Sequence, residues 1–191
     1  MNMIGVSLIG WVHTLASTAA ILIGAVLIFG PKGTPRHRFA GRWYVYTMIA
    51  ANVLSFGVYH FDIVHFVPFD AGPNRFGLFH WESVFTLFFL LLGWYAALHQ
   101  RRAIWAYLHP VSMLITYYML IGALVNEIFV RVPFLRAIAT AQMHGSSNPA
   151  RSPIALGIQN AFVVIFLVLL IVFITQVALR HRRMRATAVP V

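Results

Sequence analysis

Nine histidines and four carboxylates are the residues of this 191-residue sequence that could carry acid–base or metal chemistry. The chain has no cysteine, which excludes disulfides, thiolate metal ligands and a cysteine nucleophile. The motifs HExxH, GxSxG and the P-loop are also absent, so familiar hydrolases and nucleotide enzymes have no support. Histidine binds metals and titrates near neutral pH, so its position along the chain decides which chemistry is open to it.

Four of the histidines fall where they could hold a cofactor. His13 lies about ten residues into the first apolar segment, beside small residues typical of helix packing. His80 lies in the third apolar segment, while His37 and His109 flank the second and fourth toward the same side. Membrane cytochromes hold b-type haem between two histidines that face each other across a four-helix core. The pairs His13–His80 and His37–His109 are therefore candidate ligands for haem b or a divalent metal.

Simpler interpretations of these histidines stay open. His37 stands between two arginines, a position that equally suits contact with a lipid headgroup or phosphate. His13 could hydrogen-bond to a neighbouring helix, or it could relay protons. A weaker metal site is suggested by His60, Asp62 and His65 together with Glu82, although the H-x-D-x2-H spacing matches no strict zinc motif.

The composition assigns these residues to a membrane protein. In this chain 60% of the residues are hydrophobic and 9% are charged, whereas roughly a quarter of the residues of a soluble domain are charged. Its mean hydropathy is +0.80. The net charge of +10 comes from basic residues in short segments between apolar runs, so it reflects topology rather than nucleic acid binding.

Five apolar segments approach the ~20 residues needed to cross ~30 Å of hydrocarbon. We expect transmembrane helices at about residues 3–30, 43–59, 76–98, 103–126 and 154–179. The sequence thus predicts an all-α membrane bundle, with residues 1–191 forming one domain. Pro110 leaves open whether the fourth helix begins or is kinked at His109. Residues 128–140 suit a stretch at the membrane interface, and the first segment is expected to be retained rather than cleaved as a signal.

The distribution of charge predicts the orientation. One side of the bundle collects ten basic residues, namely Lys32, Arg36, Arg38, Arg42, Arg101, Arg102, Arg180, Arg182, Arg183 and Arg185. The other side collects four, Arg75, Arg131, Arg136 and Arg151, together with all the acidic residues, Asp62, Asp70, Glu82 and Glu127. The positive-inside rule makes the ten-residue side cytoplasmic, with the N-terminus outside and the C-terminus inside an inner (cytoplasmic) membrane.

Several short motifs lie between about residues 10 and 136. They comprise His13, then Pro31-Lys32-Gly33-Thr34, His37-Arg38, Gly41-Arg42-Trp43-Tyr44-Val45 and Met48, then His80, then His109, Met113 and Tyr117, and finally Pro133 and Arg136. In this pattern the sequence resembles the bacterial membrane family catalogued as domain of unknown function 2306. The resemblance implies a membrane fold, implies no established reaction, and points to His13, His37, His80 and His109 as recurring polar positions. The helix at 154–179 lies outside it.

Three functions fit these observations. The first is a small inner-membrane redox, metal-binding or haem-binding protein that uses the four histidines. The second is a non-catalytic accessory or assembly subunit, which would pack on a membrane-protein partner or on a second copy. The third is a proton-coupled carrier of small solutes with His13 and Glu82 in a relay. In all three, Lys32, Arg36 and their basic neighbours contact anionic lipids of the inner leaflet at ~1 kcal/mol per charge.

Overall fold

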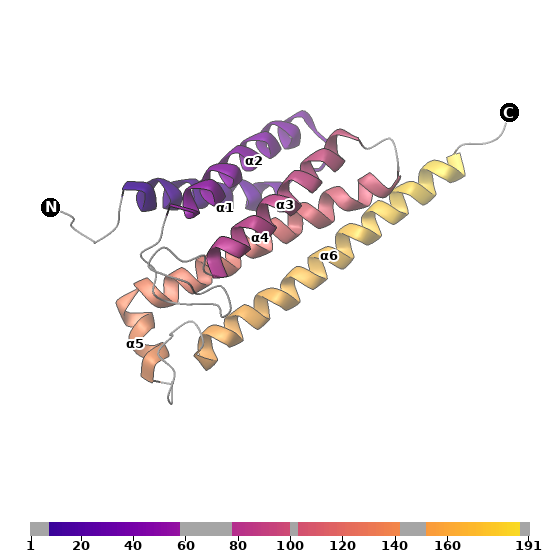
Figure 1. Ribbon diagram of the computed structural model, residues 1–191. Helices are drawn as coiled ribbons and strands as arrows, with labels where there is room; N and C mark the ends of the chain where they lie inside the picture. The colour runs from indigo at the N-terminus through magenta and orange to yellow at the C-terminus, as the bar shows by residue number, and fades with distance from the viewer. Residues whose placement is uncertain (1–7, 58–77, 100–102, 142–151, 188–191) are drawn as a thin grey trace.

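The computed structural model describes residues 8–57, 78–99, 103–141 and 152–187. In these ranges the chain forms helices and no strands, as the sequence predicts (Figure 1). The helices are α1 (Leu8–Phe29), α2 (Pro35–Ser55), α3 (Leu78–Leu98), α4 (Ala103–Arg131), α5 (Pro133–Ala141) and α6 (Pro153–Thr187).

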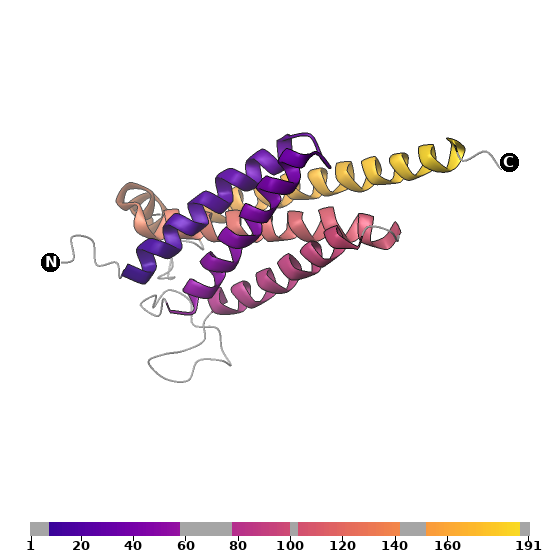
Figure 2. The same cartoon turned by 90° about the horizontal axis from the view of Figure 1, so that it is seen from above.

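The long helices pack side by side with alternating direction. α1 and α2 form an antiparallel pair on one side of the antiparallel α3–α4 pair, and α6 lies against α4 on the other side (Figures 1 and 2). The short helix α5 lies at the end of α4, near the start of α6. As a result, the end of α1, the start of α2, the end of α3 and the start of α4 lie at one end of the bundle, here called the basic end.

Four of the described helices are long and apolar enough to cross a membrane. They cover Leu8–Phe29, His80–Leu98, Ile104–Phe129 and Pro153–Leu179, with mean hydropathies of 2.1, 1.5, 1.6 and 3.1. Their outward surfaces are apolar: Leu22, Phe88 and Ile171 are each more than half exposed. Exposed side chains of this kind are stable against lipid, so the fold fits a membrane protein.

α2 differs from the expected second segment. The helix begins at Pro35 rather than near residue 43, so it includes His37 and three arginines in its first two turns. Thr34 explains the early start, because its side chain accepts a hydrogen bond from the His37 backbone N–H at 3.1 Å and caps the helix. Pro35 follows at the first helical position, where its missing N–H costs nothing. Because of its arginines, α2 is not among the four apolar candidates.

Two further boundaries differ from the sequence expectation. α4 begins at Ala103 and passes through Pro110, so it does not begin at His109. Proline is tolerated in membrane helices because neighbouring helices can satisfy the backbone carbonyl it leaves without a partner. α6 continues to Thr187, about eight residues beyond the apolar span that ends at Leu179.

The core lies between α1, α2 and the α3–α4 pair. Its buried residues are Ala20, Tyr44, Val45, Met48 and Leu90. Met48 lies four residues after Tyr44 and three after Val45, so these side chains form one stripe that faces the other helices. A smaller cluster at the opposite end, Val125, Phe129, Ala139 and Ala155, joins α4, α5 and α6.

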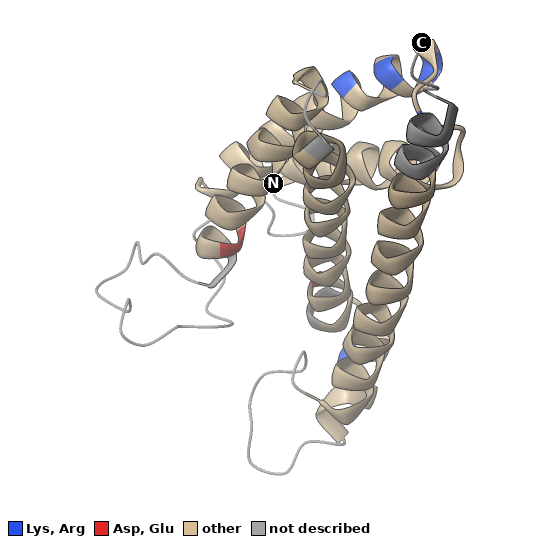
Figure 3. Ribbon diagram, turned by 90° about the vertical axis from the view of Figure 1, so that its right-hand side faces the viewer, with Lys and Arg blue, Asp and Glu red and all other residues tan. Residues whose placement is uncertain are grey.

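Charged residues separate along the bundle. The blue segments of Figure 3 gather mainly at the end where the C-terminus of α6 lies, and the red segment lies toward the other end. Lys32, Arg36, Arg38 and Arg42 belong to the basic end, whereas Glu82 and Arg136 belong to the opposite one. This separation follows the distribution expected from the sequence.

Candidate functional site

The turn between α1 and α2 fixes the start of α2 and therefore the position of His37. Lys32 Nζ donates hydrogen bonds to the carbonyl oxygens of Leu27, Ile28 and Gly30, at 2.7, 2.5 and 2.9 Å. These carbonyls lack partners within the helix, so the ammonium group caps the end of α1. Gly33 follows with φ +77°, a conformation that favours glycine, and turns the chain toward Thr34.

The Lys32 ammonium also contacts α6. It lies 5.2 Å from the centre of the Phe173 ring, a distance at which a cation is attracted to the face of an aromatic ring. Burial lowers the pKa of Lys32 below its ordinary value. The turn is thereby tied to two helices at the basic end.

His37 and His109 are brought together by this arrangement. Their ring centres lie 6.4 Å apart, and the ring planes are at 89° to each other. The His37 ring comes from the first turn of α2 and the His109 ring from the second turn of α4. Two residues 72 positions apart in the sequence therefore meet at the basic end. This is one of the two pairs expected from the sequence.

The tautomer of His109 follows from its hydrogen bond. Nδ1 lies 2.9 Å from the carbonyl oxygen of Gly93 on α3. A carbonyl can only accept, so Nδ1 carries the hydrogen and Nε2 of the neutral ring keeps its lone pair. Metal-binding histidines are commonly held in this way, with one nitrogen bound to a backbone carbonyl and the other turned to the metal.

Gly93 permits this contact because α3 and α4 approach closely there. A side chain at position 93 would place its Cβ 3.0 Å from Ser112 Cβ and 3.3 Å from Met113 Cγ. Both values are shorter than ordinary van der Waals contact. The close approach of the two helices therefore positions His109 on the backbone of α3.

The electrostatic surroundings keep His37 neutral. Burial, followed by the nearby His109 and Lys32, lowers the pKa of His37 below its ordinary value near 6.5. A histidine must be unprotonated to bind a metal, so these surroundings favour the ligand form at neutral pH. Exposed arginines at positions 36, 38 and 42 lie within five residues of His37 along α2.

His13 also has its Nδ1 on a helix backbone. Nδ1 lies 2.8 Å from the carbonyl oxygen of Ala51 on α2, so it donates and Nε2 is the acceptor. This is the interhelical hydrogen bond expected for His13 in its simpler interpretation. The bond fixes the same tautomer as in His109, so it leaves ligand chemistry at Nε2 open.

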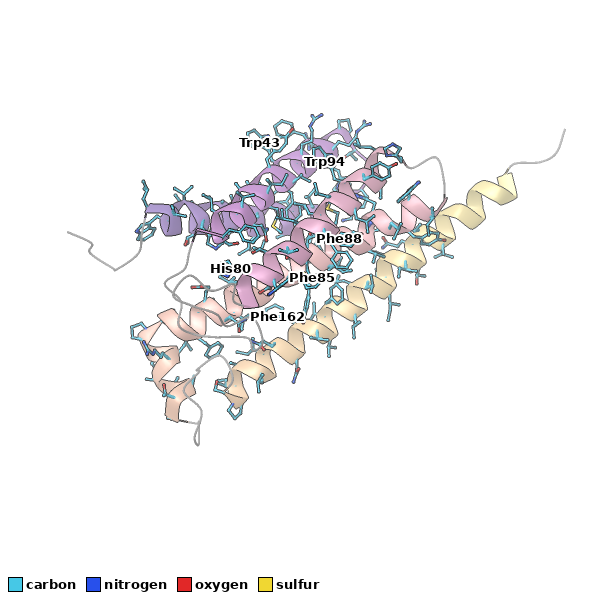
Figure 4. All side chains as sticks on the ribbon, viewed as in Figure 1. Trp43, His80, Phe85, Phe88, Trp94 and Phe162 are labelled. Atoms are coloured by element: carbon cyan, nitrogen blue, oxygen red, sulfur yellow. The ribbon has the colours of Figure 1, made fainter. Side chains whose placement is uncertain are left out.

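His80 is buried at the start of α3, and Trp94 lies toward the other end of that helix (Figure 4). The His80 ring stacks on the ring of Phe56, which directly follows α2, with the ring centres 6.1 Å apart. Close by, the hydroxyl groups of Ser55 and Ser83 join α2 to α3 at 2.7 Å. His13 and His80 thus lie near the same part of α2, and the pairing of their rings stays a prediction.

Most of the weaker metal set cannot be placed. His60, Asp62 and His65 lie outside the described residues, and Glu82 is a half-buried residue of α3. Within the described ranges, no group of three or more His, Asp or Glu side chains is close enough to hold a metal ion. The two-histidine pair at the basic end is therefore the candidate site that the structure supports best.

Two contacts near the site, made by Tyr44 and Tyr117, were not foreseen from the sequence. The Tyr44 hydroxyl lies 3.0 Å from Thr116 Oγ1 in the buried centre of the bundle. The ring of Tyr117 covers Gly24, where a Cβ would lie 2.4 Å from two of its ring carbons. The sequence shows tyrosines in the fourth apolar segment and small residues in the first. Which tyrosine meets which glycine depends on the rotation of each helix about its axis.

Comparison of the chain with protein-family models, with curated proteins and with solved structures finds no match. The resemblance noted from the sequence therefore stays a prediction.

Proposed function

We propose that this protein is a multi-pass inner-membrane protein that binds a metal-centred redox cofactor through His37 and His109. The observation that carries the proposal is the 6.4 Å separation of the two rings, contributed by different helices. The bond from His109 Nδ1 to Gly93 supports it, because it presents Nε2 as a ligand atom. His13, with its Nδ1 bound to Ala51, and His80 form the second candidate pair toward the opposite end.

The ring separation agrees with the length of metal–nitrogen bonds. These bonds are about 2.0–2.1 Å, and a ring centre lies about 1.2 Å behind its nitrogen, so two imidazoles on one ion have centres at most about 6.6 Å apart. The observed 6.4 Å lies just inside this limit. His37 and His109 would therefore be able to hold one metal ion between them.

The direction of the helices supports five membrane crossings. α1 and α3 are both apolar candidates, and both start at the end opposite the basic one. The chain must return between them, and α2 does so, from Lys32 at the basic end to the Ser55–Ser83 contact at the other. With the positive-inside rule, the basic end is cytoplasmic, the N-terminus lies outside and the C-terminus inside.

A histidine-ligated transition metal supplies one-electron redox chemistry, and the protein sets its potential through ligands, hydrogen bonding and burial. The residues of this chain hold the ligands in place: Thr34 starts the helix that carries His37, and Gly93 orients His109. Burial and the nearby His109 and Lys32 lower the pKa of His37, which favours the neutral form that binds a metal.

The proposal is tested on protein purified in detergent, by its absorption spectrum and its metal content. We expect a bound metal or haem that is lost in His37→Ala and in His109→Ala. His99→Ala is the matched control, since His99 is exposed at the same end and its Nδ1 bonds to Tyr95 of its own helix. A folded, colourless and metal-free wild-type protein would overturn the proposal and favour an accessory subunit.

A further inference from the structure

The inward stripe of α2 is open at one position close to His37. Gly41 lies one helical turn after His37, on the same face as Tyr44, Val45 and Met48, which are buried. A Cβ built on Gly41 would meet no atom within 4 Å. The face of α2 that is packed tightly in the middle of the bundle therefore leaves open space at Gly41, one turn from His37.

Gly24 and Gly93 behave differently, whereas Gly122 and Gly157 border open space as Gly41 does. The space beside Gly24 on α1 is filled by the ring of Tyr117, and that beside Gly93 on α3 by Ser112 and Met113. At these two positions glycine allows one helix to approach another. At Gly41 the missing side chain borders open space instead, so no neighbouring helix packs against this position.

The charge around this space is positive. Lys32, Arg36, Arg38 and Arg42 lie within a segment of eleven residues that carries no acidic residue. Sites for bare divalent cations use carboxylates to offset the charge of the ion, and no group of three or more His, Asp or Glu lies close together in the described part of the chain. A ligand with negative groups of its own is stabilised here, whereas a bare cation is repelled.

We infer that the His37–His109 site takes a flat iron tetrapyrrole with carboxylate side chains, a haem, whose ring lies against the backbone of Gly41. This inference rests on the proposed function and identifies its cofactor. Two histidines on opposite sides of an ion leave the plane between them to the four ring nitrogens, in agreement with the 6.4 Å separation. The carboxylates lie toward the arginines at positions 36, 38 and 42, with which they form charge-assisted hydrogen bonds.

Gly41→Leu is the most direct test. Apoprotein in detergent is titrated with haemin, and the Soret band gives the affinity. We expect Gly41→Leu to weaken binding at least about tenfold, because its side chain occupies the space of the ring. The thermal stability of the apoprotein should be unchanged or higher, because glycine is a poor helix former. Gly122→Leu is the control: it too adds a side chain in open space, on α4 about 20 Å along the helix from His109.

A second comparison tests the charges and does not depend on the folding of the leucine variant. Wild-type protein should bind haemin more tightly than its dimethyl ester, and Arg36→Gln/Arg38→Gln should remove that preference. Equal binding of haemin by wild-type protein and a folded Gly41→Leu variant would overturn the inference, as would equal binding of haemin and its ester by wild-type protein. Cu²⁺, a redox-active ion, bound through His37 and His109 by a protein that binds no haemin would also overturn it, while leaving the proposed function intact.

Discussion

Tyr44 donates its hydroxyl hydrogen to Thr116 Oγ1, 3.0 Å away, in the buried centre of the bundle. The direction follows from a second bond, in which Thr116 donates its own hydrogen to the carbonyl oxygen of Met113 at 2.8 Å. Because threonine has one hydroxyl hydrogen, its oxygen must accept from the tyrosine. The pair joins α2 to α4 midway between the two groups of histidines.

This direction predicts unequal effects of removing each partner. Tyr44→Phe leaves Thr116 bonded to Met113, so we expect a loss of about 0.5–1.5 kcal/mol in the free energy of unfolding. Thr116→Val leaves the buried Tyr44 hydroxyl without an acceptor, and the expected loss is about 1–3 kcal/mol. Unfolding of both variants in mild detergent measures the difference. A larger loss in Tyr44→Phe than in Thr116→Val would contradict the assigned direction.

Gly24 is expected to tolerate no side chain. A Cβ at this position would lie 2.4 Å from two ring carbons of Tyr117 and 3.1 Å from a ring carbon of Tyr44, so Gly24→Ala must displace the Tyr117 ring. That displacement also strains the bond from the Tyr117 hydroxyl to the Ile21 carbonyl, now 3.3 Å. Overpacking of this kind costs about 1–3 kcal/mol, which unfolding in detergent would detect.

Gly122→Ala is the matched control for Gly24→Ala. Its Cβ would meet nothing within 4 Å, so alanine should be neutral or should stabilise α4 by up to about 1 kcal/mol. Equal stability of the two variants would mean that α1 does not approach α4 as closely as the structure has it.

The apolar helices could be predicted from the sequence because lipid exposure requires long runs without charge. Each of the four membrane candidates starts within about five residues of the predicted start of its segment. The predicted end of α3, residue 98, is also correct. The predicted start of α2, near residue 43, was wrong because Arg36, Arg38 and Arg42 indicated a loop at the membrane surface. Thr34 and Pro35, a typical N-cap followed by a first-turn proline, were the signal for the true start.

The candidate site could be predicted in part. His37 and His109 were expected to be a pair because both flank their segments on the same side, and helix ends on one side of a bundle lie close together. The carbonyl partners of His13 and His109 could not be predicted, because they depend on the rotation of α2 and α3 about their axes. The space beside Gly41 is equally a property of the packing, which no local motif specifies.

The hydrogen bond between Gln159 and Asn126 should couple α6 to α4. Gln159 Nε2 donates to Asn126 Oδ1 at 2.6 Å, in a contact otherwise made by apolar side chains. Polar pairs between membrane helices contribute on average about 0.6 kcal/mol, and up to about 1.7. A double-mutant cycle of Asn126→Ala and Gln159→Ala should return a coupling energy in this range. Gln176→Ala, at an exposed position of α6, is the control and should show no coupling with Asn126→Ala.

His37 should make the stability of the apoprotein depend on pH. Burial, His109 and Lys32 lower its pKa in the folded protein, so the unfolded chain binds the proton more tightly. The stability from His37 is therefore fully present above the unfolded pKa of about 6.5 and is lost as the pH falls through the lower folded value. Thermal unfolding of the metal-free protein between about pH 5 and pH 8 measures this loss.

His37→Gln isolates this contribution, because glutamine keeps a polar side chain that does not titrate. We expect the variant to lose less stability than wild-type protein as the pH falls, while His99→Gln, changed at an exposed histidine of the same end, should follow the wild-type curve. Protons compete with a metal for the same nitrogen, so cofactor affinity in wild-type protein should weaken over the same pH range. If His37→Gln and wild-type protein lose stability in parallel, another group dominates the acid sensitivity, and His37 is not held neutral by its surroundings.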